Sequence, residues 1–441
     1  MENTPIDHKI VGEQIALSKL PNVGRASIRE LVRLVNEIER RTGDKFVRME
    51  MGVPGLEPPD IGIEAEIAAL KRGVSSKYPM IDGVPELKRE VKRFVKLFIN
   101  IDVDEQGCIP SVGSMQGAMA AFMVANRSDA KKFGTLFIDP GFPVQKQQCR
   151  VLGHEFESFD VYDYRGEKLG PKLESFLESG TVSTILYSNP NNPSWICFTD
   201  QELETIGKLA TKYDAIVIED LAYFGMDFRK DYSQPGVPPY QPTVANYTDN
   251  WMMLISSSKA FSFAGERVGS IVISDKLFSR NYPDLARYYS STYFGYSMIF
   301  GALYSLSSGV NHSAQFGLAA MLKAANDGQF NFVENVQEYG RRAKVIKKLF
   351  TSSGFNIVYD TDIDEPIADG FYFTFSYPGL NGDELLEKLL YYGISAISLN
   401  ITGSKRTEGL RACVSQIHPS QYSDLENRLK QFSKNHQLAQ K

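Results

Sequence analysis

A lysine follows three serines in the run Ser256-Ser257-Ser258-Lys259. A sheltered lysine amine can lose its proton and attack a carbonyl carbon, so this residue is a candidate for covalent capture of an aldehyde. Without further context, a solvated surface lysine explains the same residue more simply. The interpretation therefore depends on the motifs that accompany Lys259 along the chain.

Three motifs accompany Lys259 in a fixed order. They are Asn189-Pro190-Asn191-Asn192-Pro193, Asp220-Leu221-Ala222-Tyr223 and Gly265-Glu266-Arg267-Val268-Gly269. With these motifs in this order, the sequence resembles the class I/II aminotransferases of pyridoxal-5′-phosphate (PLP) fold type I, over roughly residues 45 to 418. The resemblance implies an enzyme that uses PLP as its cofactor and carries it as a Schiff base on Lys259.

The resemblance also implies roles for groups around the cofactor ring. Asp220 would pair with the protonated pyridine nitrogen and keep the ring an electron sink for the carbanion at the substrate α-carbon. Asn192 and Tyr223 would hydrogen-bond the 3′-oxygen, which tunes the acidity of the Schiff base. Phe142 would stack on the ring. The expected catalytic residues are Lys259, Asp220 and Tyr223.

The phosphate of PLP must be neutralised and held. An arginine can provide a charge-assisted contact, and backbone N–H groups at a helix N-terminus face an anion. The resemblance places such a turn just before the small-residue segment 117–121. The expected phosphate ligands are Gly113, Ser114, Met115, Ser256, Ser258 and Arg267.

Further matches concern the substrate and the assembly. Arg411, in Leu410-Arg411-Ala412, matches the arginine that binds the substrate α-carboxylate, a task suited to a planar two-pronged donor. Gly52 and Asn192 match residues beside the substrate. Tyr78 matches a tyrosine that reaches the cofactor phosphate of the neighbouring subunit, which implies a homodimer with active sites at the subunit interface.

The sequence departs from the family pattern in two places. Pro193-Ser194-Trp195 stands where the family usually continues with Thr-Gly, and the aromatic stretch 282–306 is longer than the family norm. Either feature could narrow the substrate pocket or fill an interface. No second arginine can be assigned to a side-chain carboxylate, so an aspartate-type specificity is not supported.

Short apolar runs alternate with helix-like segments between residues 110 and 275, which predicts βαβ units and a mainly parallel sheet. Polar or turn-forming residues follow the first four runs. Because ligands bind at the carboxyl ends of strands in open α/β sheets, we expect these residues to share one pocket. The predicted strands are Thr135–Ile138, Thr184–Tyr187, Ala215–Ile218, Met252–Ile255 and Ser270–Ile273.

Helical spacing predicts a helix over Glu86–Phe98, with further helix pieces at Ala319–Ala325 and Arg342–Phe350. Predicted strands of a C-terminal domain are Gly370–Ser376, Ile394–Leu399 and Leu410–Val414. The expected fold is α/β of PLP fold type I: a large domain with a mainly parallel seven-stranded sheet between helices, and a smaller α+β domain. The expected domains are 1–60 (N-terminal arm and part of the small domain), 61–315 (large PLP-binding domain) and 316–441 (C-terminal small domain).

Composition excludes several classes of function. A net charge of −5 without a basic stripe argues against nucleic-acid binding. No apolar run approaches the ~20 residues needed to span a bilayer, and the polar N-terminus does not look like a secretory signal, so we expect a cytoplasmic protein. Four dispersed cysteines and five scattered histidines predict free thiols and no metal site.

The predicted function is transfer of an amino group from an L-amino acid to a 2-oxo acid, as part of amino acid metabolism or biosynthesis. The same scaffold leaves alternatives open, because fold does not settle the reaction. They are a PLP-dependent C–S β-lyase, an enzyme like 1-aminocyclopropane-1-carboxylate synthase and, more remotely, a non-enzymatic PLP-binding regulator.

Overall fold

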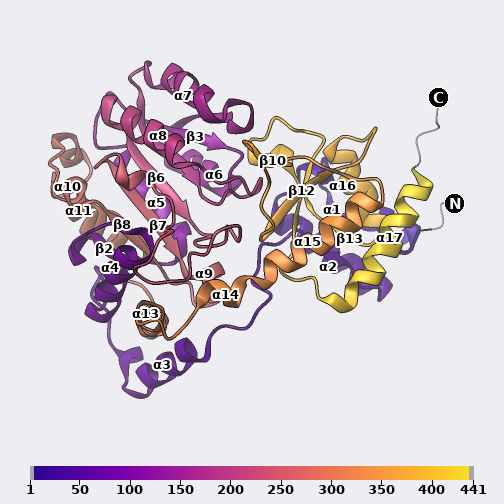
Figure 1. The fold of residues 1–441 in the computed structure, drawn as a ribbon, viewed down its shortest axis with the longest axis horizontal. Helices are drawn as coiled ribbons and strands as arrows, with labels where there is room; N and C mark the ends of the chain where they lie inside the picture. The colour runs from indigo at the N-terminus through magenta and orange to yellow at the C-terminus, as the bar shows by residue number, and fades with distance from the viewer. Residues whose placement is uncertain (1–3, 437–441) are drawn as a thin grey trace. The chain divides into compact units, whose positions relative to one another are not determined.

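The computed structural model describes residues 4–436, and contacts within the chain divide it into two compact units (Figure 1). The ends of the two outer predicted domains, residues 1–3 and 437–441, lie outside the described residues. Unit 1 comprises Met1–Gly55, Asn192–Ile196 and Gln337–Lys441, and unit 2 comprises Leu56–Asn191 and Cys197–Val336.

Unit 2 is built on a seven-stranded sheet with the order β2-β8-β7-β6-β5-β3-β4. All strands run in the same direction except β8, which is antiparallel to both of its neighbours. The predicted sheet and its five predicted strands are confirmed, with bounds that differ by up to three residues. The strands are β2 (Cys108–Ser111), β3 (Gly134–Asp139), β4 (Glu155–Asp160), β5 (Val182–Ser188), β6 (Ile216–Leu221), β7 (Trp251–Ser256) and β8 (Gly269–Ile273).

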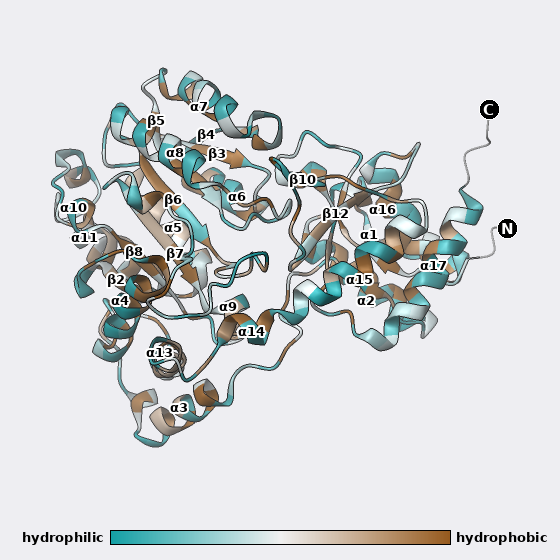
Figure 2. Ribbon diagram, in the orientation of Figure 1, coloured by the Kyte–Doolittle hydropathy of each residue, from teal (hydrophilic) through white to brown (hydrophobic). Residues whose placement is uncertain are grey.

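The central strands are hydrophobic throughout because both of their faces are covered. Every residue of β5, β6, β7 and β8 is buried, and Figure 2 shows hydrophobic residues along much of the sheet. Helix α5 (Gly113–Ala125) packs closely against β7 and β8 at Gly117, which faces Leu254 of β7 and Ile271 of β8. A Cβ atom on Gly117 would lie 3.0 Å from Leu254 Cδ2, so the close approach depends on glycine.

The other helices of unit 2 include the predicted helix Glu86–Phe98, which is confirmed as part of α4. Helix α13 packs against both α3 and α4. The aromatic stretch resolves into a 3₁₀ turn (Pro283–Arg287), α11 (Phe294–Tyr296), a π-helical segment (Ser297–Leu303) and α12 (Tyr304–Ser307). The remaining helices are α3 (Asp60–Lys71), α4 (Pro85–Ile99), α6 (Pro143–Leu152), α7 (Leu169–Leu177), α8 (Asp200–Lys212), α9 (Ser257–Ala260), α10 (Asp275–Phe278), α13 (His312–Asn326) and α14 (Phe332–Val336).

Unit 1 combines a four-stranded sheet, β14-β15-β12-β9, with the two-stranded pair β1-β13 and the hairpin β10-β11. The three predicted C-terminal strands are confirmed, although the second divides into β13 and β14. Its strands are β1 (Val47–Arg48), β9 (Asn356–Ile357), β10 (Thr361–Asp362), β11 (Glu365–Pro366), β12 (Tyr372–Ser376), β13 (Ile394–Ser395), β14 (Ile397–Ser398) and β15 (Leu410–Cys413).

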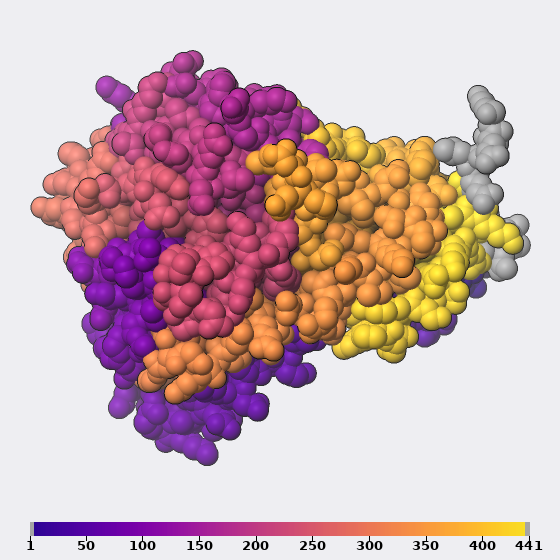
Figure 3. Space-filling model, in the orientation of Figure 1, coloured from indigo at the N-terminus to yellow at the C-terminus, as the bar shows by residue number. Residues whose placement is uncertain are grey.

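Helices cover the sheet of unit 1. Helix α2 begins at a capping box formed by Ser27 and Glu30 and ends at Gly43 in the left-handed region (φ 79°). Helix α17 lies on the surface of this unit (Figure 3). No helix within residues 4–436 is long and apolar enough to cross a membrane. The helices are α1 (His8–Ser18), α2 (Ile28–Thr42), α15 (Glu338–Ser352), α16 (Gly382–Tyr391) and α17 (Tyr422–Asn435).

Candidate active site

Lys259 lies where a central strand of unit 2 passes into a short helix. Strand β7 ends at Ser256 and α9 begins at Ser257, so the half-buried Lys259 is held at the carboxyl edge of the sheet. Ser256 Oγ accepts a hydrogen bond from the Ser258 amide at 3.1 Å. Ser257 Oγ donates to the carbonyl of Val268 at 2.5 Å, which ties the lysine segment to the residue after Arg267.

Asp220 is a buried carboxylate on the neighbouring strand β6. It accepts hydrogen bonds from Gln145 Nε2 at 2.8 Å and from the Ala222 amide at 3.2 Å, and both donors are uncharged. Burial raises the pKa of Asp220 to about 6 because desolvation disfavours the charged form. A buried carboxylate with neutral donors fits the protonated pyridine nitrogen of PLP, which would supply the missing positive charge.

A second part of the same edge fits the phosphate of PLP. Helix α5 begins at Gly113 (φ 63°), and its N-cap residue, Val112, makes no side-chain hydrogen bond to the first amides of the helix. Gln116 Oε1 accepts only from the preceding Val112 amide, at 2.7 Å. A Cβ atom on Gly113 would lie 2.7 Å from Arg267 Nη2, so glycine allows the guanidinium to reach the helix N-terminus. Ser114 Oγ is buried and has no hydrogen-bond partner within residues 4–436. Uncapped amides, an arginine and an unpartnered hydroxyl suit a bound phosphate.

The other predicted cofactor ligands of unit 2 lie at the same sheet edge. Phe142 is half-buried between β3 and α6, and Tyr223 is buried directly after β6. The carbonyl of Met115, in the first turn of α5, accepts a hydrogen bond from Gln148 Nε2 at 2.8 Å. Strand β8 runs antiparallel to its neighbours, so its first residue, Gly269, pairs with Ser256 at the carboxyl end of β7. Arg267 lies two residues before Gly269 and is therefore at the same edge of the sheet.

Gln145 is a contact of the site that sequence reasoning missed. It lies on α6, is 4% exposed, and is the only side chain that donates to Asp220 in the part of the chain that the structure describes. From sequence, a glutamine outside any motif is interpreted as a surface residue, so only the burial of Gln145 identifies it as part of the site.

Tyr78 has a different environment from the other predicted ligands. Its side chain is 92% exposed in the single chain. It follows a 3₁₀ turn at Val74–Ser76 and precedes α4. This exposure does not place Tyr78 among the buried groups at the sheet edge, and the role predicted for it would need a neighbouring subunit.

The predicted substrate residues Arg411, Asn192 and Gly52 belong to unit 1. Arg411, on β15, is 3% exposed, donates through Nη2 to the carbonyl of Glu50, and donates through Nη1 to Asn192 Oδ1 at 3.4 Å. Its Nε is buried and has no hydrogen-bond partner among the described residues. An arginine with a buried, unused donor suits a carboxylate ligand, because leaving such a donor unpaired is costly.

Gly52 is required by its surroundings in unit 1. A Cβ atom at this position would lie 1.9 Å from the hydroxyl oxygen of Tyr372, so the phenol occupies the space of a side chain at residue 52. Tyr372 was not expected at the site, because a tyrosine in a hydrophobic strand reads as a core residue.

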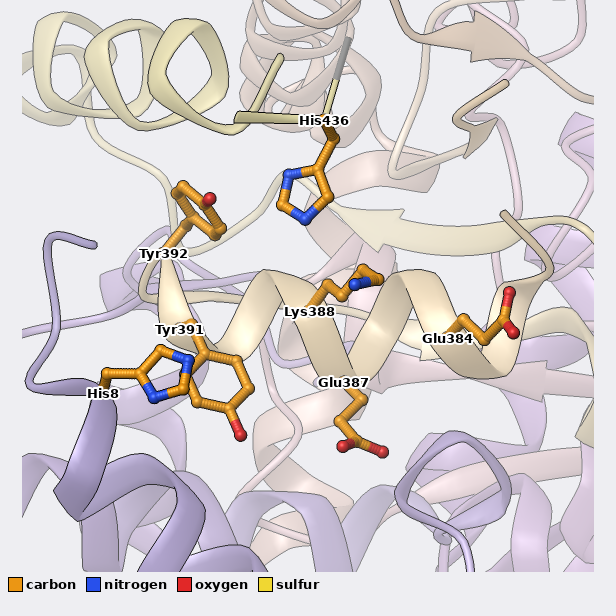
Figure 4. Close-up of a pocket in the computed structure, with 7 residues that line it drawn as sticks. All are labelled: His8, Glu384, Glu387, Lys388, Tyr391, Tyr392 and His436. Carbon is orange, nitrogen blue, oxygen red and sulfur yellow. The ribbon is translucent and has the colours of Figure 1, made fainter. Parts of the chain in front are cut away.

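A separate hollow lies in unit 1 and contains none of the predicted site residues (Figure 4). The His8 ring packs against the Tyr391 ring with centroids 4.4 Å apart. No group of three or more His, Cys, Asp or Glu side chains within residues 4–436 is arranged to hold a metal ion. The hollow is lined by His8, Glu384, Glu387, Lys388, Tyr391, Tyr392 and His436.

Comparison with known proteins identifies the family of this chain. The family described as aminotransferase class I and II matches residues 45–429. The chain is 24% identical over 353 residues to a probable aspartate aminotransferase of Methanocaldococcus jannaschii, covering 75% of this chain and 88% of that protein. It is 26% identical over 246 residues to an LL-diaminopimelate aminotransferase of Natranaerobius thermophilus, covering 55% and 61%.

Solved structures share the fold. An alanine aminotransferase from Pyrococcus furiosus matches with a TM-score of 0.76 and 18% identity, covering 94% of this chain and 98% of that one. An aspartate aminotransferase from Thermus thermophilus with maleate matches with a TM-score of 0.72 and 18% identity, covering 96% and 98%. With a family match over most of its length, the chain belongs to the class I and II aminotransferases.

Proposed function

We propose that this protein is a PLP-dependent aminotransferase that moves an amino group from an L-amino acid to a 2-oxo acid, with the cofactor bound covalently at Lys259. The supporting observation is the set of groups at one edge of the unit 2 sheet, in a chain of this family. A lysine, a buried carboxylate with neutral donors and an arginine beside an uncapped helix N-terminus meet three separate demands of one cofactor.

The bound cofactor would supply an electron sink for the electron pair left at the substrate α-carbon. Asp220 would keep the ring nitrogen protonated, because a buried carboxylate stabilises a positive charge next to it. Lys259 Nζ, displaced by the substrate amine, would take the proton from the α-carbon and return a proton to C4′. Arg267, Ser114 and the first amides of α5 would hold the phosphate.

Arg411 would bind the α-carboxylate of the substrate. Its unused Nε and the remaining protons on Nη1 and Nη2 give a fork that matches two carboxylate oxygens. Asn192, which accepts from Arg411, would help to fix this fork and hydrogen-bond the 3′-oxygen of the cofactor ring. These roles make the carboxylate common to all amino acids, rather than one side chain, the main recognition element.

The test is the half-reaction without an acceptor. Purified holoenzyme is mixed separately with each of the twenty common L-amino acids. An amino acid that is a substrate should give one molecule of 2-oxo acid per active site, after which the reaction should stop. Sustained release of ammonia or sulfide together with pyruvate would instead show a β-lyase, and no reaction with any amino acid would favour a binding protein. The relatives described above are named as aminotransferases, and no observation favours the alternatives.

We also propose a homodimer, supported by an exposed aromatic face in unit 2. The exposed fractions are 54% for Tyr293, 46% for Tyr296, 45% for Phe300 and 54% for Tyr304. Monomeric proteins rarely expose so many large apolar side chains in one segment. A second copy of the chain would cover this face, and it would also give the exposed Tyr78 a phosphate to contact.

Replacing Phe300 by Glu should convert the dimer to a monomer, because a charge buried without a partner opposes association. Light scattering after size exclusion should change from twice the chain mass to the chain mass of 49.4 kDa. Val345→Glu is the matched control, because Val345 is similarly exposed (41%) but lies on α15 of unit 1. A dimer that survives Phe300→Glu would contradict this choice of interface.

A further inference from the structure

Trp195, which belongs to one of the two departures from the family pattern, is a completely buried residue of unit 1. Its side chain is 0% exposed, and its backbone adopts a positive φ of 67°. The indole takes the space beside Gly370, where a Cβ atom would lie 1.9 Å from Trp195 Cε2. The absence of a side chain at Gly370 therefore leaves the space that the indole of Trp195 fills, and the indole is not in contact with solvent.

Tyr372 connects Trp195 to the substrate residues of unit 1. The rings of Trp195 and Tyr372 meet edge to face, with centroids 6.1 Å apart and planes at 72°. The hydroxyl of Tyr372 occupies the space above Gly52, and the side chain is 2% exposed. The Tyr372 ring is therefore buried between contacts to Trp195 and to Gly52.

Arg411 lies over the face of that ring. The distance from Arg411 Cζ to the ring centroid of Tyr372 is 4.5 Å, within the range of a cation–π contact. The register explains it: β12 pairs with β15 so that Thr374 lies opposite Arg411, and Tyr372 is the diagonal neighbour on the same face. Diagonal neighbours are within reach of long and aromatic side chains.

We propose that Tyr372 and Trp195 are positioning residues that set the plane of the Arg411 guanidinium and thereby the affinity for the substrate carboxylate. The inference rests on the carboxylate role proposed for Arg411. Hydrogen bonds to Glu50 and Asn192 fix two nitrogen atoms, and the ring of Tyr372 fixes the plane in which the third, Nε, can donate. Trp195 acts indirectly on the guanidinium, by packing against Tyr372.

The substitution Tyr372→Met removes the ring face but keeps an apolar side chain. It should raise the KM for the amino acid that wild-type enzyme converts fastest by roughly 10-fold, because the cation–π contact of a desolvated guanidinium is lost. The kcat and the cofactor content should stay within about 3-fold of wild type. Tyr372→Phe keeps the ring face, so its KM should return close to the wild-type value.

Phe373→Leu is the matched control, because Phe373 is as deeply buried (2% exposed) and lies next to Tyr372 but on the opposite face of β12. It should lower thermal stability without changing KM. Trp195→Phe should raise KM in the same direction as Tyr372→Met but less. If Tyr372→Met does not fold, Trp195→Phe carries the test with the same control.

The Arg411→Lys variant separates this inference from the proposed function. If Arg411→Lys leaves KM unchanged, the carboxylate role of Arg411 is wrong. If Arg411→Lys raises KM while the Tyr372 and Trp195 variants behave like Phe373→Leu, only the positioning role is overturned. A raised KM in Arg411→Lys, Tyr372→Met and Trp195→Phe, with a KM near wild type in Tyr372→Phe, supports both the carboxylate role and the positioning role.

Discussion

The Lys259→Ala enzyme should lack the visible absorbance band of a Schiff base between cofactor and lysine, and its aminotransferase activity should fall by roughly 10⁴-fold or more. The amine of Lys259 would both hold the cofactor covalently and carry the substrate α-proton, and removing a nucleophile that also acts as a base removes both contributions. Absorbance spectra and initial rates on the dialysed variant measure the two effects separately.

Lys276→Ala controls for the loss of a lysine from unit 2. Lys276 lies on α10 and pairs with Asp249 at 2.6 Å on the surface. Such exposed pairs contribute little to stability, so the spectrum and rate should stay at wild-type values. An unchanged Schiff-base band in Lys259→Ala would mean that another lysine carries the cofactor.

Asp220→Asn should lower activity by roughly 1,000-fold while the cofactor remains attached to Lys259. The substitution keeps the shape of the side chain and can still accept from Gln145, but it removes the charge that stabilises the protonated ring nitrogen. Losses of about 10² to 10³ are typical when one preorganised electrostatic contact to developing charge is removed. Stopped-flow absorbance at saturating amino acid measures the rate of the chemical step.

The cofactor-free form of the same variant should be more stable than cofactor-free wild type at pH 8. Burial raises the pKa of Asp220 from 3.8 to about 6, so the folded state binds the proton more tightly than the unfolded state. The stability from that proton is complete below pH 3.8 and lost as pH rises through 6. At pH 8 the neutral amide avoids this loss, which is about 3 kcal/mol.

Glu219→Gln is the control for both effects. Glu219 lies beside Asp220 on β6 and is also buried, and burial raises its pKa to about 7. Its carboxylate accepts from the hydroxyl groups of Tyr187 and Thr243, neither of which is a predicted cofactor ligand. The variant should share the gain in stability at high pH but keep activity within about 3-fold of wild type. Equal losses of activity in both variants would contradict the assignment of Asp220.

The parallel strands could be predicted from sequence because continuous apolar runs are typical of strands covered on both faces. The antiparallel direction of β8 could not be predicted. Its run, Gly269–Ile273, is as apolar as the neighbouring strands, and the direction of a strand does not change its amino-acid composition. The π-helical segment Ser297–Leu303 was equally beyond prediction, because a π-helix differs from an α-helix only in hydrogen-bond spacing.

Some residues of the candidate site could also be predicted from the sequence, and others could not. Lys259, Asp220 and Arg267 could be chosen from sequence because each stands in a motif with a chemical purpose. Gln145 and Tyr372 could not, because their importance comes only from the partner they contact in three dimensions, Asp220 for one and Arg411 for the other.

Transfer of nitrogen is the most direct test of the proposed reaction. Holoenzyme is incubated with a mixture of ¹⁵N-labelled common L-amino acids and, in separate reactions, unlabelled 2-oxoglutarate, pyruvate or oxaloacetate. Each mixture lacks the one amino acid that its 2-oxo acid would form, and the products are measured by mass spectrometry. The proposed function predicts that the amino acid formed from at least one 2-oxo acid carries ¹⁵N, in amounts well above the enzyme concentration, and that Lys259→Ala forms none. Release of the ¹⁵N as ammonia, without a labelled amino acid product, would contradict it.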